Sequence, residues 1–307
     1  MLGLGSSLTL SSTPEGAWAT KFLSLNGEEN TFAKVVNMQN LMGGISAGGG
    51  DDIGDNFTLS FWVRPMWVMS SASGNQSVAG TDASGSASVE NNVPFISMGS
   101  TETELDRIRA NYILDTSGGS DRNRLQAQLL SDSSNKNHDE WFLHSGNNQY
   151  TGTGSTLDSS GVNTGWWHAN NTGNANDQGF VHVVMCRGTD EWLCYWNAQA
   201  LGDEININAG TVAMEEAAID ELWIGKNFGN QSTVPGGYRD ISIFKKQLDA
   251  SEVSELYNSG ELWDVRKHSA SSDLGLYWPC EDNLEHIQNA PLVLSGEATF
   301  SVVGMSR

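Results

Sequence analysis

The sequence predicts an all-β protein in which two antiparallel sheets pack as a sandwich, with one short capping helix and long loop insertions. Short runs of alternating apolar and polar residues recur along the chain, as in 57–65, "FTLSFWVRP", and this period is typical of strands. Stretches rich in glycine, serine and asparagine separate these runs. A single segment, 249–260, carries both start and stop signals of a helix. The 307 residues are enough for one large β domain with a sizeable core.

The first two predicted strands each have one apolar face. In "KFLSLNG", Lys21–Gly27, Leu23 and Leu25 point to one face, and Asn26-Gly27 predicts the turn that ends the strand. In 57–65 the odd-numbered positions are apolar, and Pro65 ends the strand because proline cannot donate to the sheet.

Two long insertions interrupt the strands. The first, about 66–92, is of low complexity and buries too little apolar surface to order alone, so we expect a long loop. The second, about 132–177, is polar, and insertions of that length are usually functional or form a docking surface. Strands are predicted around these insertions from Val93, at Arg107–Asp115 and at Arg124–Ser131.

The clearest hairpin lies in "GFVHVVMCRGTDEWLCYWNAQALGDE". Apolar residues alternate before and after Gly188-Thr189-Asp190, whose residue types suit a tight reversal. Cys186 and Cys194 lie on its two arms; with Cys280 they make an odd number without metal spacing, so we expect buried free thiols, a cross-strand contact being the alternative. Later strands are predicted at Asp220–Asn227, at Tyr238–Phe244 and in "LGLYWP", "APLVLSG" and "ATFSVVG", about 14 strands in all.

The helix is specified by its own residues. Asp249 is the predicted N-cap, and Glu252, three residues on, completes a capping box. Val253, Leu256 and Tyr257 form one apolar stripe, and Gly260 stands where a left-handed cap belongs. A helix of about nine residues is marginal alone. We therefore expect its stripe to dock on the sheets, as a plug over one end or edge of the sandwich core.

Together these segments resemble the laminin-G-like, concanavalin A-like jelly-roll family. The likeness is carried by "FLSLNG", "FTLSFWVRP", the central hairpin and "ELWIGKN…GYRDISIFKKQLDASEVSELYNSG", the last nearly position by position. It covers about residues 20–262 and implies two antiparallel sheets packed face to face. We accordingly expect an N-terminal arm, 1–20, and a single domain, 21–307, that carries the two insertions.

The sequence predicts no enzyme. Some sandwiches of this type are glycoside hydrolases, which need two facing carboxylates, but the nearest acidic run, Glu215, Glu216, Asp220 and Glu221, does not have the Glu-x-Asp-x-x-Glu spacing. No Gly-x-Ser-x-Gly elbow or phosphate loop occurs. The histidines have no ligand spacing; they are His138, His144, His168, His182, His268 and His286.

Calcium is the one cofactor that the resemblance allows, because the family often binds Ca²⁺ at the sandwich rim through carboxylates and carbonyls. Asp51, Asp52 and Asp55 lie in "GGGDDIGDN", and Asp240 stands where the family commonly has an acidic residue. The alternative is a solvated acidic loop and a turn-forming aspartate.

A glycan site is predicted in "NTGWWHANNTGN", within the second insertion. Trp166 and Trp167 are adjacent, so on a strand they would point to opposite faces and leave one indole exposed for stacking on a sugar ring. Asn170 and Asn171 supply amide donors and acceptors. The alternative is that both tryptophans anchor the insertion to the body of the protein.

Charge and the N-terminal segment bound the partners. A net charge of −21 argues against nucleic acid and anionic membranes, since like charges repel. "MLGLGSSLTLSSTPEG" has no basic n-region, which makes it a poor secretory signal. The chain contains no apolar stretch near the roughly 20 residues of a membrane span. "MLGLGSSLTLSS" is similar to the start of many tailed-phage virion proteins, which are made in the host cytoplasm without a signal.

Two functions follow as hypotheses. The first is a virion structural protein of a bacteriophage, a capsid decoration or other outer-surface protein that docks on a protein lattice, with other virion proteins or copies of itself as partners. The alternative is a carbohydrate-binding adhesin or lectin module on a tail or cell surface, with calcium as an aid. We also expect the arm, 1–20, to become ordered only on a neighbouring molecule.

Overall fold

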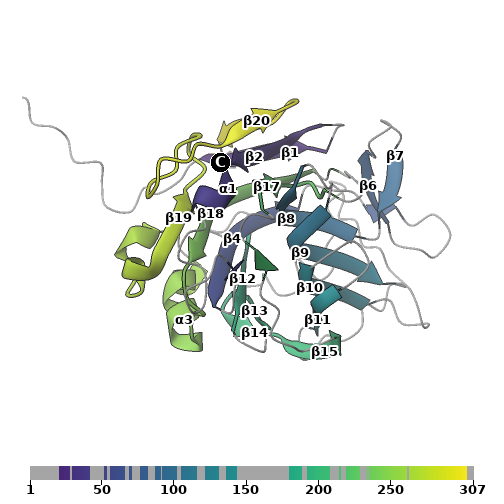
Figure 1. Ribbon diagram of the computed structural model, residues 1–307. Helices are drawn as coiled ribbons and strands as arrows, with labels where there is room; N and C mark the ends of the chain where they lie inside the picture. The colour runs from purple at the N-terminus through teal and green to yellow at the C-terminus, as the bar shows by residue number, and fades with distance from the viewer. Residues whose placement is uncertain are drawn as a thin grey trace, which may run out of the picture.

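Two eight-stranded sheets, in which every described pairing is antiparallel, form the body of the protein (Figure 1). The computed structural model describes residues 21–27, 30–41, 52–53, 56–65, 69–70, 77–81, 87–90, 92–101, 105–115, 122–130, 136–143, 180–188, 192–207, 214–215, 219–228, 233, 235–260 and 263–302. The predicted fold class, an all-β antiparallel sandwich with one capping helix, is confirmed.

The first sheet consists, in spatial order, of β14 (Gln199–Ala200), β13 (Trp192–Trp196), β12 (Val181–Arg187), β4 (Phe57–Pro65), β18 (Pro235–Phe244), β1 (Lys21–Asn26) and β21 (Thr299–Val302), with β19 (Leu274–Trp278) also paired to β18. The second sheet consists of β15 (Gly202–Ile207), β11 (Lys136–Leu143), β10 (Arg122–Leu130), β9 (Leu105–Asp115), β8 (Asn92–Ser100), β17 (Glu221–Ile224), β2 (Phe32–Val36) and β20 (Val293–Ser295). The predicted hairpin is β12–β13, and its cysteines are buried free thiols as predicted.

Both insertions contain strands that their amino-acid composition does not predict. The first contains a three-stranded sheet of β5 (Met69–Ser70), β6 (Ser77–Thr81) and β7 (Ala87–Glu90), so the prediction of a loop throughout was wrong. The second begins with β11, which pairs with β10 and β15. Pairing with neighbouring strands supplies backbone hydrogen bonds to a polar segment, and composition alone does not reveal such partners. A further small sheet joins β3 (Asp52–Ile53) to β16 (Met214–Glu215).

The main core lies between the two large sheets. It takes the predicted apolar face of each early strand, namely Leu23, Leu25, Phe57, Leu59, Phe61 and Val63. Phe61 of β4 and Phe95 of β8 meet edge to face across the sheets, with ring centroids 5.6 Å apart. Strand β1 ends at Asn26, and Gly27 takes a φ of 77°, which the predicted turn requires.

The outer face of the first sheet is buried as well, which the sequence did not predict. Helix α3 (Ala250–Tyr257) and the short helices η3 (Asn258–Gly260), η4 (Val265–Lys267) and η5 (Ser271–Asp273) follow β18, and α3 lies on the same side of the molecule as β18 and β19 (Figure 1). Val253 and Leu256 of α3 pack with Val184 and Phe244 of the sheet in a second apolar cluster. The helix therefore covers a sheet face rather than an end or edge of the core.

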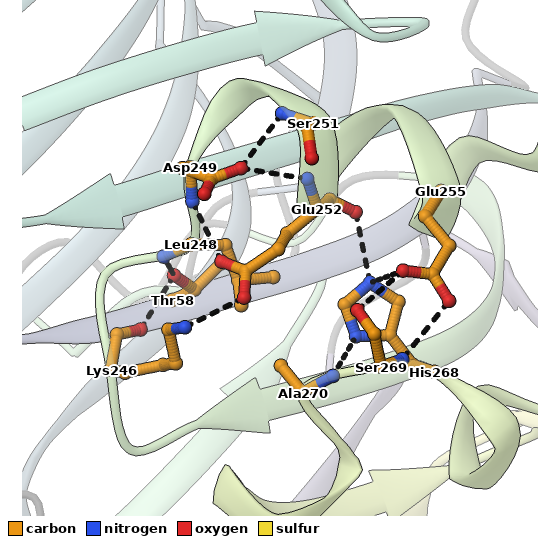
Figure 2. Close-up of polar contacts among 10 residues, drawn as sticks. All are labelled: Thr58, Lys246, Leu248, Asp249, Ser251, Glu252, Glu255, His268, Ser269 and Ala270. Atoms are coloured by element: carbon orange, nitrogen blue, oxygen red, sulfur yellow. Dashed lines mark hydrogen bonds and ion pairs between the residues drawn. The ribbon is translucent and has the colours of Figure 1, made fainter.

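The predicted start of α3 is confirmed. Asp249 accepts hydrogen bonds from the backbone N–H of Ser251 and of Glu252, and Glu252 accepts one in return from the N–H of Asp249 (Figure 2). The predicted end is wrong by two residues: Asn258, with a φ of 46°, is the left-handed C-cap. Asparagine tolerates this conformation, and Gly260 takes a positive φ of 87° only after it. One more helix, α1 (Met38–Leu41), precedes 42–51.

Candidate functional site

Asp240 occupies an irregular point in the middle of β18. The first half of β18 pairs with β1 and the second half with β19, while its register with β4 shifts between Arg239 and Ser242. Asp240 has a φ of 48°, in the left-handed region that aspartate enters more easily than most residues. Bulges of this kind re-aim a side chain, and here the bulge places a carboxyl group under the segment that follows α3.

The carboxyl group of Asp240 is buried, with 5 % of the residue exposed. Its Oδ1 accepts a hydrogen bond of 2.7 Å from the hydroxyl of Tyr277, whereas its Oδ2 has no hydrogen-bond partner. Burial raises the pKa of Asp240 to about 6; the charge of Arg239 and the Tyr277 hydrogen bond oppose that rise, and Glu281 and Asp264 add to it. Burying a carboxylate with one oxygen unpaired costs free energy. The surroundings of Asp240 are therefore a candidate functional site.

Asp240 lines a pocket of about 30 Å³ together with residues of the covering segment. The other lining residues are Trp263, Asp264, Arg266, Tyr277, Pro279, Glu281 and His286. Asp264 and Arg266 form a two-pronged ion pair, with N–O distances of 2.8 and 2.9 Å, and Asp264 also caps η4. The pKa of Asp264 is lowered, because these bonds and charges outweigh burial, which is the largest single influence and acts the other way. The charge of Asp264 is thus balanced by Arg266, whereas Asp240 has a carboxylate oxygen without a hydrogen-bond partner.

Asp240 also lines a second, smaller cavity of about 10 Å³. Ser60 of β4 and His182 of β12 line it, and Ser60 Oγ lies 2.8 Å from His182 Nε2. The histidine ring stacks on Trp62 and Tyr257, with centroids 4.8 and 5.9 Å apart. Serine, histidine and aspartate thus line one cavity, and this set of residue types is that of a nucleophilic triad.

The geometry does not make these three residues a working triad. His182 Nδ1 and Asp240 Oδ2 both have no hydrogen-bond partner, so the aspartate does not orient the imidazole. Burial lowers the pKa of His182 to about 3, far from the operating pH that suits a general base. Ser60 and His182 are each 1 % exposed, so a substrate cannot reach the hydroxyl. The Ser60–His182 pair is a buried structural contact between β4 and β12.

The acidic run considered for glycoside hydrolysis is also engaged in the framework where the structure describes it. Asp220 accepts hydrogen bonds from Ser100 and from the backbone of Thr101. Glu221 pairs with Lys34 at 2.7 Å and accepts from the indole of Trp223 at 2.5 Å. Glu215 lies in β16, and Glu216 is outside the described residues.

Two of the four predicted calcium ligands, Asp52 and Asp240, lie among the residues that the structure describes. Asp52 lies in β3, paired with Glu215 of β16, and Asp240 lies in β18. Asp51 and Asp55 fall outside the described residues. Among the described side chains, no group of three or more His, Cys, Asp or Glu residues could hold a metal ion. The calcium site predicted at Asp51, Asp52, Asp55 and Asp240 stays a prediction.

The predicted glycan site, with Trp166, Trp167, Asn170 and Asn171, lies outside the described residues. Four tryptophans on described strands are buried; they are Trp62, Trp192, Trp196 and Trp223. Within the described ranges, no helix combines the length and the apolar character that crossing a membrane demands.

Comparisons with known proteins give similarity to solved structures alone. No protein-family model matches the chain. No curated protein sequence matches it either. A heptameric SAP-like pentraxin from Limulus polyphemus is 10 % identical with a TM-score of 0.48, over 93 % of this chain and 96 % of that one. A Bacteroides ovatus protein considered carbohydrate-binding is 8 % identical with a TM-score of 0.47, and the match covers 92 % of this chain and 60 % of that one. The LG4-5 domains of the mouse laminin alpha1 chain are 9 % identical with a TM-score of 0.37, and the match covers 75 % of this chain and 44 % of that one. This chain thus spans less than two thirds of the latter two.

The sequence analysis named Asp240 only as a candidate calcium ligand and did not identify its neighbours in the pocket. Tyr277 lies in β19, which pairs with β18, and Trp263 lies between η3 and η4. No spacing in the sequence links either residue to Asp240. His182 carried a usable signal, because in "VHVVMC" it alternates with residues of the main core and so faces outward from a central strand.

Proposed function

We propose that this protein is a non-catalytic binding module, in which the β-sandwich is a scaffold that presents its insertions to a ligand. The observation that carries the proposal is the state of Ser60, His182 and Asp240, which are buried and not paired as a triad. The described acid–base groups of the sheets, Asp220 and Glu221 among them, hold the framework together. Ser60, His182 and Asp240 therefore offer a substrate neither a reachable nucleophile nor a positioned base.

The ligand that we propose is a surface carbohydrate. Trp166 and Trp167 combine an aromatic stacking surface with the amides of Asn170 and Asn171 in one polar stretch. This composition suits a sugar, which offers an apolar ring face and a rim of hydroxyl groups. Calcium is an aid to binding if Asp51 and Asp55 form a rim site.

A glycan array tests this proposal. We expect the purified protein to bind a subset of glycans, and Trp166→Ala/Trp167→Ala to lose that binding. The matched control is Leu284→Ala/Ile287→Ala, which removes two apolar side chains that are 49 % and 41 % exposed and leaves the proposed site intact. Repeating the array in a chelator separates a calcium-dependent site from a calcium-free one. An array without bound glycans, or equal loss in both double variants, would contradict the proposal.

A second candidate is the outer surface of a phage particle, where the module would dock on a protein lattice. A net charge of −21 and the N-terminal stretch "MLGLGSSLTLSS" favour it. Antibodies against the protein should label the outside of particles banded in a density gradient from lysates of its source. Particles that lack the protein by mass spectrometry would rule this location out.

A further inference from the structure

The unpaired carboxylate oxygen of Asp240, Oδ2, is the feature of the pocket that suggests a ligand. The residue is 5 % exposed, its Oδ1 is bound by Tyr277, and its Oδ2 has no hydrogen-bond partner although it belongs to a side chain that lines the pocket. A buried carboxylate oxygen without a donor costs free energy that a hydrogen-bonding ligand would recover. Glu281 and His286 are exposed, so the pocket runs from solvent to a buried end at Asp240.

The charges around the pocket select the sign of that ligand. Asp264 is neutralised by its own ion pair with Arg266. Arg239 precedes Asp240 and favours its charged form, but its guanidinium stacks at 4.2 Å on the ring of Phe180. Glu281 adds a further negative charge. An anion would be repelled by the carboxylates of Asp240 and Glu281. A cation with N–H donors would be attracted by their negative charge and could donate a hydrogen bond to a carboxylate oxygen.

The aromatic walls and the size of the pocket narrow the class of cation. Trp263 and Tyr277 present ring surface, which attracts a compact organic cation. A volume of about 30 Å³ admits an ammonium group with one attached carbon but excludes a whole sugar ring or a quaternary ammonium. A multivalent metal ion is disfavoured, because no three ligands of the usual types gather among the described residues.

We propose that the Asp240 pocket binds a protonated primary amine, with the ammonium group paired with the carboxylate of Asp240 and the attached carbon against Trp263 and Tyr277. This site contains none of the residues assigned to glycan binding. It goes beyond the proposed function and can be present or absent independently of the Trp166–Trp167 site.

Binding should depend on pH through the ionisation of Asp240. Charged or titratable groups that face it are Arg239, Asp264, Arg266, Tyr277, Glu281 and His286 on the side of the pocket, His182 in the smaller cavity, and Cys280. Burial raises the pKa of Asp240 to about 6, so at pH 5 most of the free protein holds this carboxyl neutral. Because a neutral carboxyl loses its attraction for ammonium, affinity should be about tenfold weaker at pH 5 than at pH 7.5.

Methylammonium is the probe, and methanol is its neutral match in size. Binding is followed by NMR at the indole N–H of Trp263, which donates to the carbonyl of Leu256 at 3.2 Å; Trp263→Phe assigns the signal. We expect a saturable shift with a dissociation constant on the order of 10 mM, near the limit for a ligand of two heavy atoms. Tetramethylammonium chloride keeps the ionic strength constant, and it is too large to compete.

Asp240→Asn is the decisive variant, because asparagine also tolerates a positive φ and removes only the charge. We expect it to weaken methylammonium binding at least tenfold, whereas Asp282→Asn, which removes a nearby exposed charge outside the pocket, should stay within twofold. If Asp240→Asn does not fold, the pH comparison on the parent protein takes its place. No saturable shift, equal binding of methanol, or equal affinity at pH 5 and 7.5 would each overturn the proposal.

Discussion

Thr58 is the residue whose replacement best tests how the covering helix is held on the sheet. Its hydroxyl donates to the carbonyl of Lys246 at 2.8 Å and accepts from the N–H of Leu248 at 2.9 Å, just before the N-cap of α3 (Figure 2). Thr58 and Leu248 are fully buried. One side chain on β4 thus satisfies two backbone groups of the segment that leads into the helix.

Thr58→Val keeps the shape of the side chain and removes both hydrogen bonds. The N–H of Leu248 is left unpaired in the interior, which costs about 1–3 kcal/mol, and loss of the bond to the part-buried carbonyl of Lys246 adds about 0.5–1 kcal/mol. We therefore expect the free energy of unfolding to fall by about 2–3 kcal/mol. Thr58→Ser keeps the hydroxyl and removes one methyl group, so it should cost about 1 kcal/mol.

Urea unfolding followed by tryptophan fluorescence gives both free energies, and hydrogen exchange adds a local readout. The amide of Leu248 should exchange faster in Thr58→Val and at the parent rate in Thr58→Ser. The reasoning is refuted if valine is tolerated as well as serine, because the hydroxyl would then contribute nothing that the methyl groups do not.

Three further changes test the rest of the covering layer. Asp249→Ala should speed hydrogen exchange at the first amides of α3, whereas Asp249→Asn, which keeps an acceptor, should leave it nearly unchanged. Leu256→Ala truncates a leucine that is 3 % exposed and should lower the free energy of unfolding by about 2–4 kcal/mol in urea titrations; a loss under 1 kcal/mol would show that the helix is not docked. Burial raises the pKa of Asp240 to about 6 and lowers that of His182 to about 3. Between about pH 4 and 6 the folded protein keeps a proton on Asp240 that the unfolded chain releases, so the contribution of Asp240 to stability falls as pH rises through that window. His182 behaves in the opposite way: between about pH 3 and 6.5 the unfolded chain holds a proton that the folded protein lacks, so its contribution to stability rises with pH. Asp240→Asn removes the falling contribution, so between pH 4 and 6.5 its stability should rise more steeply than that of the parent, by on the order of 3 kcal/mol; parallel pH profiles would contradict this.

Local pattern was enough to predict β1 and β4 of the main core and the start of the helix. In β4 the alternation of apolar and polar residues matches the face that packs between the sheets, and at Asp249 and Glu252 the capping box needs only residues three apart. Both signals depend only on residues close in sequence, so they can be read without knowing how the rest of the chain folds.

The strands that were missed depend on partners far along the chain. Strand β2 is short, and its place is set by β17 and β20, almost 190 and 260 residues later. Strand β11 looks polar and gains its backbone partners from β10 and β15. The same holds for the pocket, since Asp240 and Tyr277 lie on paired strands whose meeting no local motif encodes.

The burial of the outer face connects the fold to the proposed pocket. Thr58 and Ser60 stand at positions of β4 that a sandwich would normally turn to water, and their hydroxyl groups suit that setting. When α3 and the residues after it cover this face, each polar group must find a partner inside the protein. Thr58 finds the backbone of the helix entry, and Ser60 finds His182. Asp240 finds Tyr277 for one oxygen only. The covering layer thus leaves Asp240 Oδ2 without a partner, as it leaves His182 Nδ1, but only Asp240 also lines the larger pocket. The amine that we propose would supply the donor that the protein does not.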